Sequence, residues 1–210
     1  MIHHLGACPL CGRISLLEYE LCPECLVTLM EGESLFWNCH HICATCGYPL
    51  LHADCVCTHG RIPALFRYRG LCRELLIAYK ERETVRLADT MAYLMCVAIT
   101  RLHTGKGIVG LVPIPSGGEN VGKFGRETNA MVAARCAREP KIEVLPLLVR
   151  AKGAPVHEIA VHEHVFHIED FELLLAIDDV MDANSCVELS LELLKQRFDI
   201  PVKALCMAMD

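Results

Sequence analysis

The first 60 residues contain a single basic side chain, Arg13, against six acidic ones, which gives this segment a net charge of −5. Binding to a nucleic-acid backbone depends mostly on attraction between cations and phosphates. The segment is therefore unsuited to that task. Residues 61–86 carry seven basic and three acidic side chains, a net charge of +4, so any contact with nucleic acid is expected there.

Long apolar runs and a leader-like start are also missing. No apolar run reaches the roughly 18 residues that a membrane helix needs, and residues 1–8 lack a basic start followed by an apolar stretch. We expect a cytoplasmic protein without a membrane span. Thiols stay reduced in that compartment, so the 14 cysteines are not expected to form a disulfide framework.

Nine of the 14 cysteines fall within the first 57 residues, and eight of these form close pairs. Two CxxC turns place four thiolates around one point, which suits tetrahedral Zn²⁺. Neighbouring pairs are expected to share one ion each. The first predicted site is Cys8, Cys11, Cys22 and Cys25, and the second is Cys43, Cys46, Cys55 and Cys57.

Alternatives remain for this cysteine-rich head. At the second site Cys39, His41 or His59 could replace one ligand. One alternative is a head of reduced structural cysteines without metal. That alternative leaves unexplained why four cysteine pairs fall in a segment with little other core. Four thiolates close the coordination sphere, so the predicted zinc is structural and not catalytic. We expect a zinc-binding domain over residues 1–60, with the boundary near Gly60–Pro63.

Residues 61–210 alternate between apolar runs and amphipathic segments. Runs without polar alternation are typical of strands buried on both faces, as in parallel sheets. We expect an α/β fold with a mainly parallel sheet flanked by helices. Strands are predicted at 64–69, 108–115, 142–148, 171–177 and 202–209, and helices at 71–81, 86–103, 128–138 and 186–198.

The apolar run 173–177 ends in two carboxylates, Asp178 and Asp179, and a helix is predicted shortly after them. Ligands of open α/β sheets bind at the carboxyl ends of strands, and a helix N-terminus favours a phosphate. Two acids at this position could hold ribose hydroxyls, as a phosphoribosyl pyrophosphate (PRPP) site requires. The alternative is a strand-to-helix turn whose acids cap the helix 186–198.

Several motifs, taken in order, resemble the ComF/GntX family of phosphoribosyltransferase-like proteins, over nearly the whole chain. The resemblance implies a type I phosphoribosyltransferase fold behind a double zinc ribbon. Best-known members of the family serve DNA uptake in natural competence. The matching pieces are the CxxC head with residues 43–49, residues 66–70 followed by Lys80, residues 112–115 followed by Gly125, residues 147–150, and Asp178-Asp179-Val180.

The chain departs from the family after the acidic pair. A Thr-Thr-Gly-x-Thr loop wraps the 5′-phosphate in the family, whereas this chain has Asp182, Ala183, Asn184, Ser185 and Cys186. Asn184 can adopt the left-handed conformation of a glycine, and Ser185 can cap the helix. A carboxylate at Asp182, about 4 Å from a phosphate charge, would cost about 4 kcal/mol at an effective dielectric of 20.

The resemblance predicts Asp178 and Asp179 as catalytic residues, and Lys80 together with residues 182–186 as the groups that bind PRPP or its phosphates. Mg²⁺ is expected only if PRPP binds. The leading expectation is a ComF-type accessory protein in DNA uptake with a degraded PRPP loop. The alternatives are an active phosphoribosyltransferase and a non-catalytic zinc-stapled interaction module. Arg69, Arg73 and Lys80 fall on one face of the predicted helix and could meet the phosphates of a nucleotide or of single-stranded DNA. The alternative is a solvated helix face.

Overall fold

The computed structural model describes most of the chain. The described residues are 3–35, 41–42, 49–50, 62–82, 84–103, 105–116, 127–150, 158–162, 167–181 and 186–209. Within these ranges, none of the helices combines the length and the apolar character that a membrane crossing requires.

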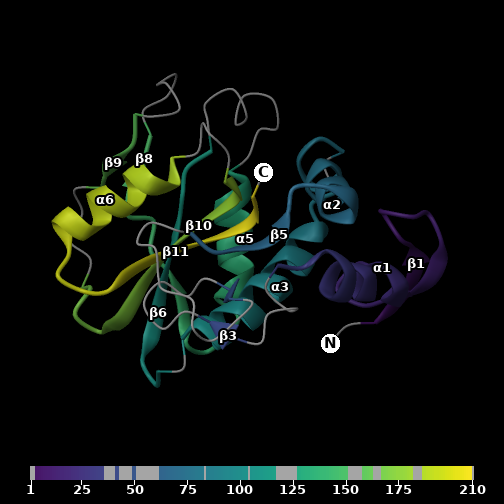
Figure 1. The fold of residues 1–210 in the computed structure, drawn as a ribbon, viewed down its shortest axis with the longest axis horizontal. Helices are drawn as coiled ribbons and strands as arrows, with labels where there is room; N and C mark the ends of the chain where they lie inside the picture. The colour runs from purple at the N-terminus through teal and green to yellow at the C-terminus, as the bar shows by residue number, and fades with distance from the viewer. Residues whose placement is uncertain are drawn as a thin grey trace.

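Five parallel strands form the central sheet (Figure 1), in the order β5-β11-β10-β6-β7. Their bounds are Ala64–Arg67 (β5), Ile108–Pro113 (β6), Ile142–Val144 (β7), Phe171–Met181 (β10) and Val202–Met209 (β11). In the register, Ile177 of β10 lies opposite Pro113 of β6 and Leu205 of β11. The predicted α/β fold with a parallel sheet is confirmed.

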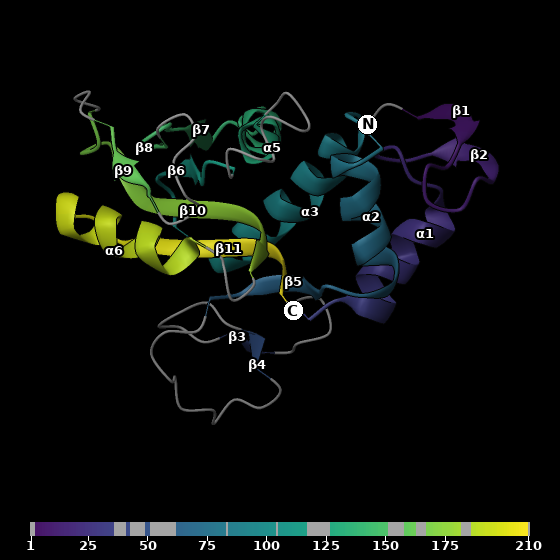
Figure 2. The ribbon, with the colours of Figure 1, turned by 90° about the horizontal axis from the view of Figure 1, so that it is seen from above.

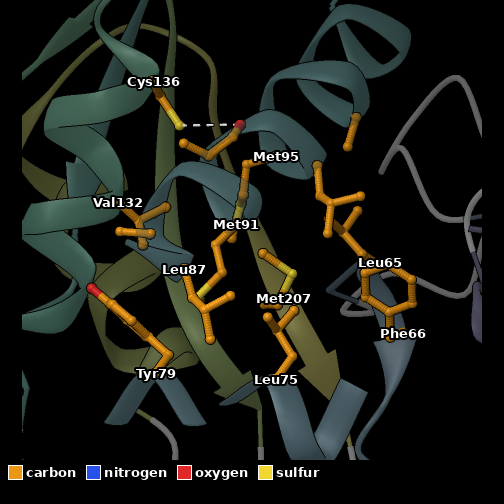
Figure 3. Packing of buried hydrophobic residues seen from close by; sticks show 14 of the residues in the cluster. Leu65, Phe66, Leu75, Tyr79, Leu87, Met91, Met95, Val132, Cys136 and Met207 are labelled. Carbon is orange, nitrogen blue, oxygen red and sulfur yellow. Dashed lines mark hydrogen bonds between the residues drawn. The ribbon is translucent and has the colours of Figure 1, made fainter. Parts of the chain in front are cut away.

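The sheet is covered on both faces, which is why its strands lack polar alternation. On one face Leu173, Leu175 and Ile177 of β10 join a buried cluster with the helices α2 (Gly70–Lys80), α3 (Leu87–Leu102) and α5 (Thr128–Cys136). Figure 3 shows this cluster, in which the Cys136 thiol donates a hydrogen bond to Ala92 O at 3.7 Å.

On the other face the alternate residues of β10, Leu174 and Ala176, join a second cluster with α6 (Val187–Arg197). Figure 2 shows α6 on one side of β10 and β11, with α5 and α3 on the opposite side. The strand order reverses between β6 and β10, because the chain runs from β6 to β7 in one direction and from β10 to β11 in the other. In open α/β sheets ligands bind at such a reversal.

The head contains more regular structure than the sequence suggested. Strands β1 (His4–Ala7) and β2 (Ile14–Leu17) form an antiparallel hairpin, followed by α1 (Pro23–Val27) and the π-helix η1 (Thr28–Glu33). These elements were not predicted, because four-residue strands between cysteines are too short to produce a visible period. Figure 1 shows β1 and α1 beside α2 and α3, at the end of the molecule away from α6.

The head shares its core with the α/β body. Leu21 and Leu29 are fully buried in the same cluster as the inward faces of α2 and α3. The backbone after η1 also meets β5, since Leu35 N donates to Leu65 O at 2.8 Å. The predicted boundary at residues 60–61 stays a prediction, since residues 51–61 lie outside the described part of the chain.

One predicted strand was too long. Residues 142–148 were expected to form a single strand, but the structure has β7 up to Val144 and β8 from Leu148 to Val149. Pro146 lies between them, and proline cannot donate to a strand ladder. Three more short strands complete the description: β9 (Ala160–Val161) pairs with β8, and β3 (His41–Ile42) pairs with β4 (Pro49–Leu50).

Candidate functional site

The first predicted metal site is assembled in the structure. The Sγ atoms of Cys8, Cys11, Cys22 and Cys25 all lie within 4.8 Å of one another. The Cys11 and Cys22 sulfurs are 3.7 Å apart. With Zn–S bonds of about 2.3 Å, a tetrahedral ZnS₄ site has S–S edges of about 3.8 Å. The four cysteines can therefore hold a metal ion with little rearrangement.

Local backbone geometry brings each pair together. Cys8 lies at the end of β1, where Gly12 N donates to Cys8 O at 2.8 Å and Cys8 N donates to Arg13 O at 2.9 Å. Gly12 has φ +74°, a left-handed conformation that glycine adopts without strain. Cys22 is the N-cap of α1, and Pro23 at the first helical position directs Cys25 back toward the same point.

The thiols of Cys8 and Cys25 differ in how readily they ionise. Burial opposes ionisation of Cys8, but hydrogen bonds from the backbone of Cys22, Cys11 and Leu10 lower its pKa to about 7. Burial raises the pKa of Cys25, and the neighbouring thiols add to that rise. Complete deprotonation therefore requires a cation at the centre, since metal binding releases protons from its ligands.

The second predicted zinc site has no structural test. Cys43, Cys46, Cys55 and Cys57 lie outside the described residues, and so do two of the proposed substitute ligands, Cys39 and His59. For the third, His41, only the backbone is described. Two ions per chain thus remain a prediction.

A second group of polar side chains gathers at the carboxyl ends of β6 and β10, where the strand order reverses. Asp179 is 7% exposed and points toward α2 and α5. Its Oδ1 lies 2.7 Å from Nζ of Lys80, the last residue of α2. Its Oδ2 lies 3.4 Å from the Thr128 hydroxyl, which donates to it from the first turn of α5. Two helices thus hold one carboxylate.

Asp178 is held by α5 and by the backbone of its own strand. Its Oδ1 accepts hydrogen bonds from Asn129 Nδ2 at 2.9 Å and from the Asp179 backbone at 2.8 Å. Asn129 also donates to Ile114 O at 2.8 Å, so one amide group links the ends of β6 and β10. Burial raises the pKa of Asp178 to about 7, and the charge of Asp179 adds to the rise.

The first turn of α5 is therefore the frame of this site. Ser116 N donates to Glu127 Oε2 at 2.9 Å, and the Ser116 and Thr128 hydroxyls are 3.2 Å apart. Asn129 and Thr128 received no role in the sequence analysis. The available signal was a polar first turn directly after a buried strand that reaches the reversal point.

The remaining predicted ligands are placed only in part. Asp182, Ala183, Asn184 and Ser185 lie outside the described residues. Cys186 is the N-cap of α6, and its sulfur lies 3.4 Å from Nη2 of Arg150. The same Nη2 donates to Pro115 O at 3.1 Å. A guanidinium group thus lies beside the start of α6 and the end of β6.

The acidic pair does not fit a directly bound Mg²⁺. Mg²⁺ requires near-octahedral oxygen ligands at about 2.0–2.1 Å. Both oxygens of Asp179 and one oxygen of Asp178 already face ammonium, hydroxyl or N–H donors. A divalent ion that used Asp179 Oδ1 would have to displace the Lys80 ammonium.

The fold and these clusters define an α/β protein with a parallel sheet, a four-cysteine group able to hold a metal ion, and a braced acidic pair at the strand reversal. No family model matches the chain. No curated protein matches it either. The function must therefore be argued from the site.

Proposed function

We propose that the chain is a ComF-type, type I phosphoribosyltransferase-like protein of the cytoplasm. In this proposal it binds a sugar phosphate at the carboxyl end of its sheet with little or no turnover, as an accessory factor in DNA uptake. The observation that supports it most is the position of Asp178 and Asp179. They lie near the carboxyl end of the central strand β10, directly after Ile177, the last residue of β10 that pairs with β6, and two helices contact their side chains.

The chemistry of the site suits a sugar phosphate. Carboxylates accept hydrogen bonds from ribose hydroxyls, and the start of α6 favours a phosphate through its free N–H groups and its dipole. Arg150 adds a positive charge beside that start. We assign residues 182–186 to phosphate binding. Asp182 is the group that weakens this binding, because its carboxylate repels the phosphate.

Titration of PRPP by calorimetry tests this proposal. We expect weak binding in wild-type protein, a loss of binding in Asp178→Asn, and a rise of up to about a thousandfold in Asp182→Thr if the charge argument is right. Asp170→Asn, an exposed acid before β10, is the matched control. Absence of PRPP binding in both wild-type and Asp182→Thr protein would refute the proposal.

Catalysis separates the leading proposal from the active-enzyme alternative. A working phosphoribosyltransferase releases pyrophosphate from PRPP when an acceptor base is present. We expect no release by wild-type protein with a panel of purine and pyrimidine bases. Release that disappears in Asp178→Asn would replace the accessory role with an enzymatic one.

We also propose that the head binds two structural zinc ions, the first at Cys8, Cys11, Cys22 and Cys25 and the second at Cys43, Cys46, Cys55 and Cys57. The sulfur geometry of the first group supports the first ion. Elemental analysis should find about two zinc per chain. One zinc per chain would remove the second site, and none would remove both.

Single-stranded DNA is the macromolecular partner we propose. Arg69 and Arg73 are exposed at the start of α2, whereas Lys80 at the end of that helix faces Asp179. Fluorescence anisotropy with a labelled oligonucleotide should show binding that weakens with salt and is lost in Arg69→Gln/Arg73→Gln. Binding that persists in this double variant would exclude that surface.

One observation favours the interaction-module alternative. On the head hairpin Leu5, Ile14 and Leu16 are 75%, 75% and 55% exposed. The register places Leu5 opposite Leu16, and Ile14 lies two residues from Leu16, so the three share one face. Exposed apolar faces of this kind mark contact sites. Two results together would support this alternative. The wild-type protein would bind no PRPP, and the double variant Leu5→Ser/Leu16→Ser would lose a partner that the wild-type protein binds.

A further inference from the structure

We propose that Lys80 takes the place of a divalent cation at the acidic pair, so that this site binds its sugar phosphate without Mg²⁺. The inference rests on the proposed function, because it concerns the same site. It deepens that function by stating which cation balances the carboxylates. It also assigns Lys80 the role of a positioning residue in place of the predicted phosphate ligand.

Lys80 is fixed in the position of a counter-ion. Its Nζ lies 2.7 Å from Asp179 Oδ1, and the two side chains are 24% and 10% exposed. The preceding residue, Tyr79, is fully buried and donates from its hydroxyl to Thr128 O at 2.8 Å. The end of α2 is thereby attached to the start of α5, which holds the Lys80 backbone beside the acidic pair and keeps its ammonium within reach of Asp179.

The other carboxylate oxygens are also directed toward donors. Asp179 Oδ2 accepts from the Thr128 hydroxyl, and Asp178 Oδ1 accepts from Asn129 and from the backbone of Asp179. Among the described residues, Asp178 Oδ2 is the one oxygen of the pair without a donor. N–H and O–H donors direct positive charge at the oxygens that a metal ion would use. The arrangement is built for hydrogen bonds and not for metal ligation.

The charge balance leads to the same conclusion. Two carboxylates and one ammonium leave a formal charge of −1 at the strand ends, half of what an unpaired acidic pair would present. A divalent cation gains less attraction from such a site, and it meets repulsion from Lys80 at close range. A sugar hydroxyl donating to Asp178 Oδ2 meets neither obstacle.

Mn²⁺ titration followed by electron paramagnetic resonance tests the inference on the zinc-loaded full chain, with Mn²⁺ standing in for Mg²⁺. We expect no Mn²⁺ site that depends on Asp178 in wild-type protein. The neutral, similarly shaped Lys80→Met should gain one, with affinity at least about tenfold above wild type because the freed carboxylate lacks its partner. The site should vanish in Lys80→Met/Asp178→Asn. Lys141→Met, an exposed lysine beside the amino end of β7, should behave as wild type.

Two results would overturn the inference. The first is wild-type Mn²⁺ binding that disappears in Asp178→Asn. The second is a folded Lys80→Met that gains no Mn²⁺ affinity, since Lys80 would then not be what excludes the ion. If Lys80→Met does not fold, as judged by circular dichroism, Lys80→Gln keeps a hydrogen-bond donor without the charge and answers the same question.

A ligand titration separates this inference from the proposed function. Ribose 5-phosphate is the probe, because it lacks the pyrophosphate that binds Mg²⁺ in solution. We expect wild-type affinity to change by less than about twofold when Mg²⁺ is added, and Lys80→Met to require Mg²⁺. Strong Mg²⁺ dependence in wild type would refute the role of Lys80. No binding with or without Mg²⁺ would count against the proposed function, while the Mn²⁺ result would still decide what Lys80 does.

Discussion

Asp178 is the residue at which burial and charge conflict most directly. Burial and the neighbouring Asp179 carboxylate raise its pKa to about 7, while Asn129, the Asp179 backbone and Lys80 favour the ionised form. In the unfolded chain the same carboxyl has the ordinary aspartate pKa of about 3.8. Between these two values the folded state binds the proton more tightly than the unfolded state does.

Asp178 should therefore make the fold less stable as pH rises. Because the folded pKa is the higher one, the free energy of unfolding falls between about pH 4 and pH 7, by up to about 4 kcal/mol in total. From about pH 5.5 to 7.5 the loss should be about 2 kcal/mol. Urea unfolding across this range measures it.

Asp178→Asn should remove this fall in the free energy of unfolding with rising pH, and Asp170→Asn should retain it. Protonation of the metal-binding thiols acts in the opposite direction, since it releases the ion as pH falls. This effect is common to both variants and cancels in the comparison. Equal slopes in the two variants would show that Asp178 ionises normally in the folded protein.

At the scale of the element, the turn after β2 joins the head to α3. Glu18 and Leu21 exchange both backbone hydrogen bonds, at 2.8 and 3.0 Å, so Tyr19 and Glu20 form a two-residue turn. Both have positive φ, 48° and 68°, a conformation that costs about 1–2 kcal/mol per non-glycine residue. The contacts of this turn must offset that strain.

Three contacts from α3 and its N-cap meet this turn. The rings of Tyr19 and Tyr93 stack with centroids 3.8 Å apart, and the Thr90 hydroxyl donates to Tyr19 O. Arg86 lies 3.7 Å from the Glu20 carboxylate at an exposed position. The ring and the carbonyl of Tyr19 thus account for most of the attachment, because exposed ion pairs contribute little.

Glycine substitutions should separate strain from contact. Glu20→Gly relieves the left-handed strain and loses two weak contacts of its carboxylate, with Arg86 at 3.7 Å and with His4 at 3.6 Å, so we expect stability to change by less than about 0.5 kcal/mol. Tyr19→Gly gains the same relief but loses the aromatic packing, and we expect a loss of about 2 kcal/mol. Thermal and urea unfolding of both variants give the comparison. Equal effects would mean that the Tyr19 ring contributes nothing to the attachment.

The elements that could be predicted from the sequence are those buried on both faces. Residues 108–113, 173–177 and 204–209 are apolar without interruption, and all three lie in strands of the sheet. The boundary after Val144 was missed although Pro146 signalled it, because the apolar pattern continues on both sides of the proline. The head hairpin could not be predicted, since each of its strands has four residues, too few to reveal a period.

The part of the site that could be predicted from the sequence is the pair of acids after an apolar run. Asp178 and Asp179 stood out because two acids end a strongly apolar run. The contacts of Asn129 with Ile114 and Asp178 depend on strand order and register. Asn129 and Ile114 are 15 positions apart in the chain, and Asn129 and Asp178 are 49 positions apart. Spacing along the sequence does not reveal these contacts. It does not reveal the pairing of Lys80 with Asp179 either.

At the scale of the whole molecule, one buried cluster runs from the metal-binding head into the α/β body. Cys8, Cys22 and Cys25 belong to it, together with Leu75 of α2 and Met91 of α3. α6 packs in the separate cluster on the opposite face of the sheet. A change at the metal centre should therefore reach α3 more readily than α6.

Metal removal should loosen α3 together with the head and leave α6 protected. Four clustered thiols, three of them buried, lose their common partner without a cation, and small metal-stabilised modules depend on that partner for folding. We expect chelation to speed amide exchange in residues 3–35 and in α3, with α6 as the internal reference, measured by hydrogen–deuterium exchange and mass spectrometry. Cys25→Ser should reproduce the pattern without a chelator. Cys96→Ala, which alters a half-buried cysteine outside the metal group, should not. Faster exchange confined to residues 3–35 would show that the head and the α/β body fold independently despite their common core.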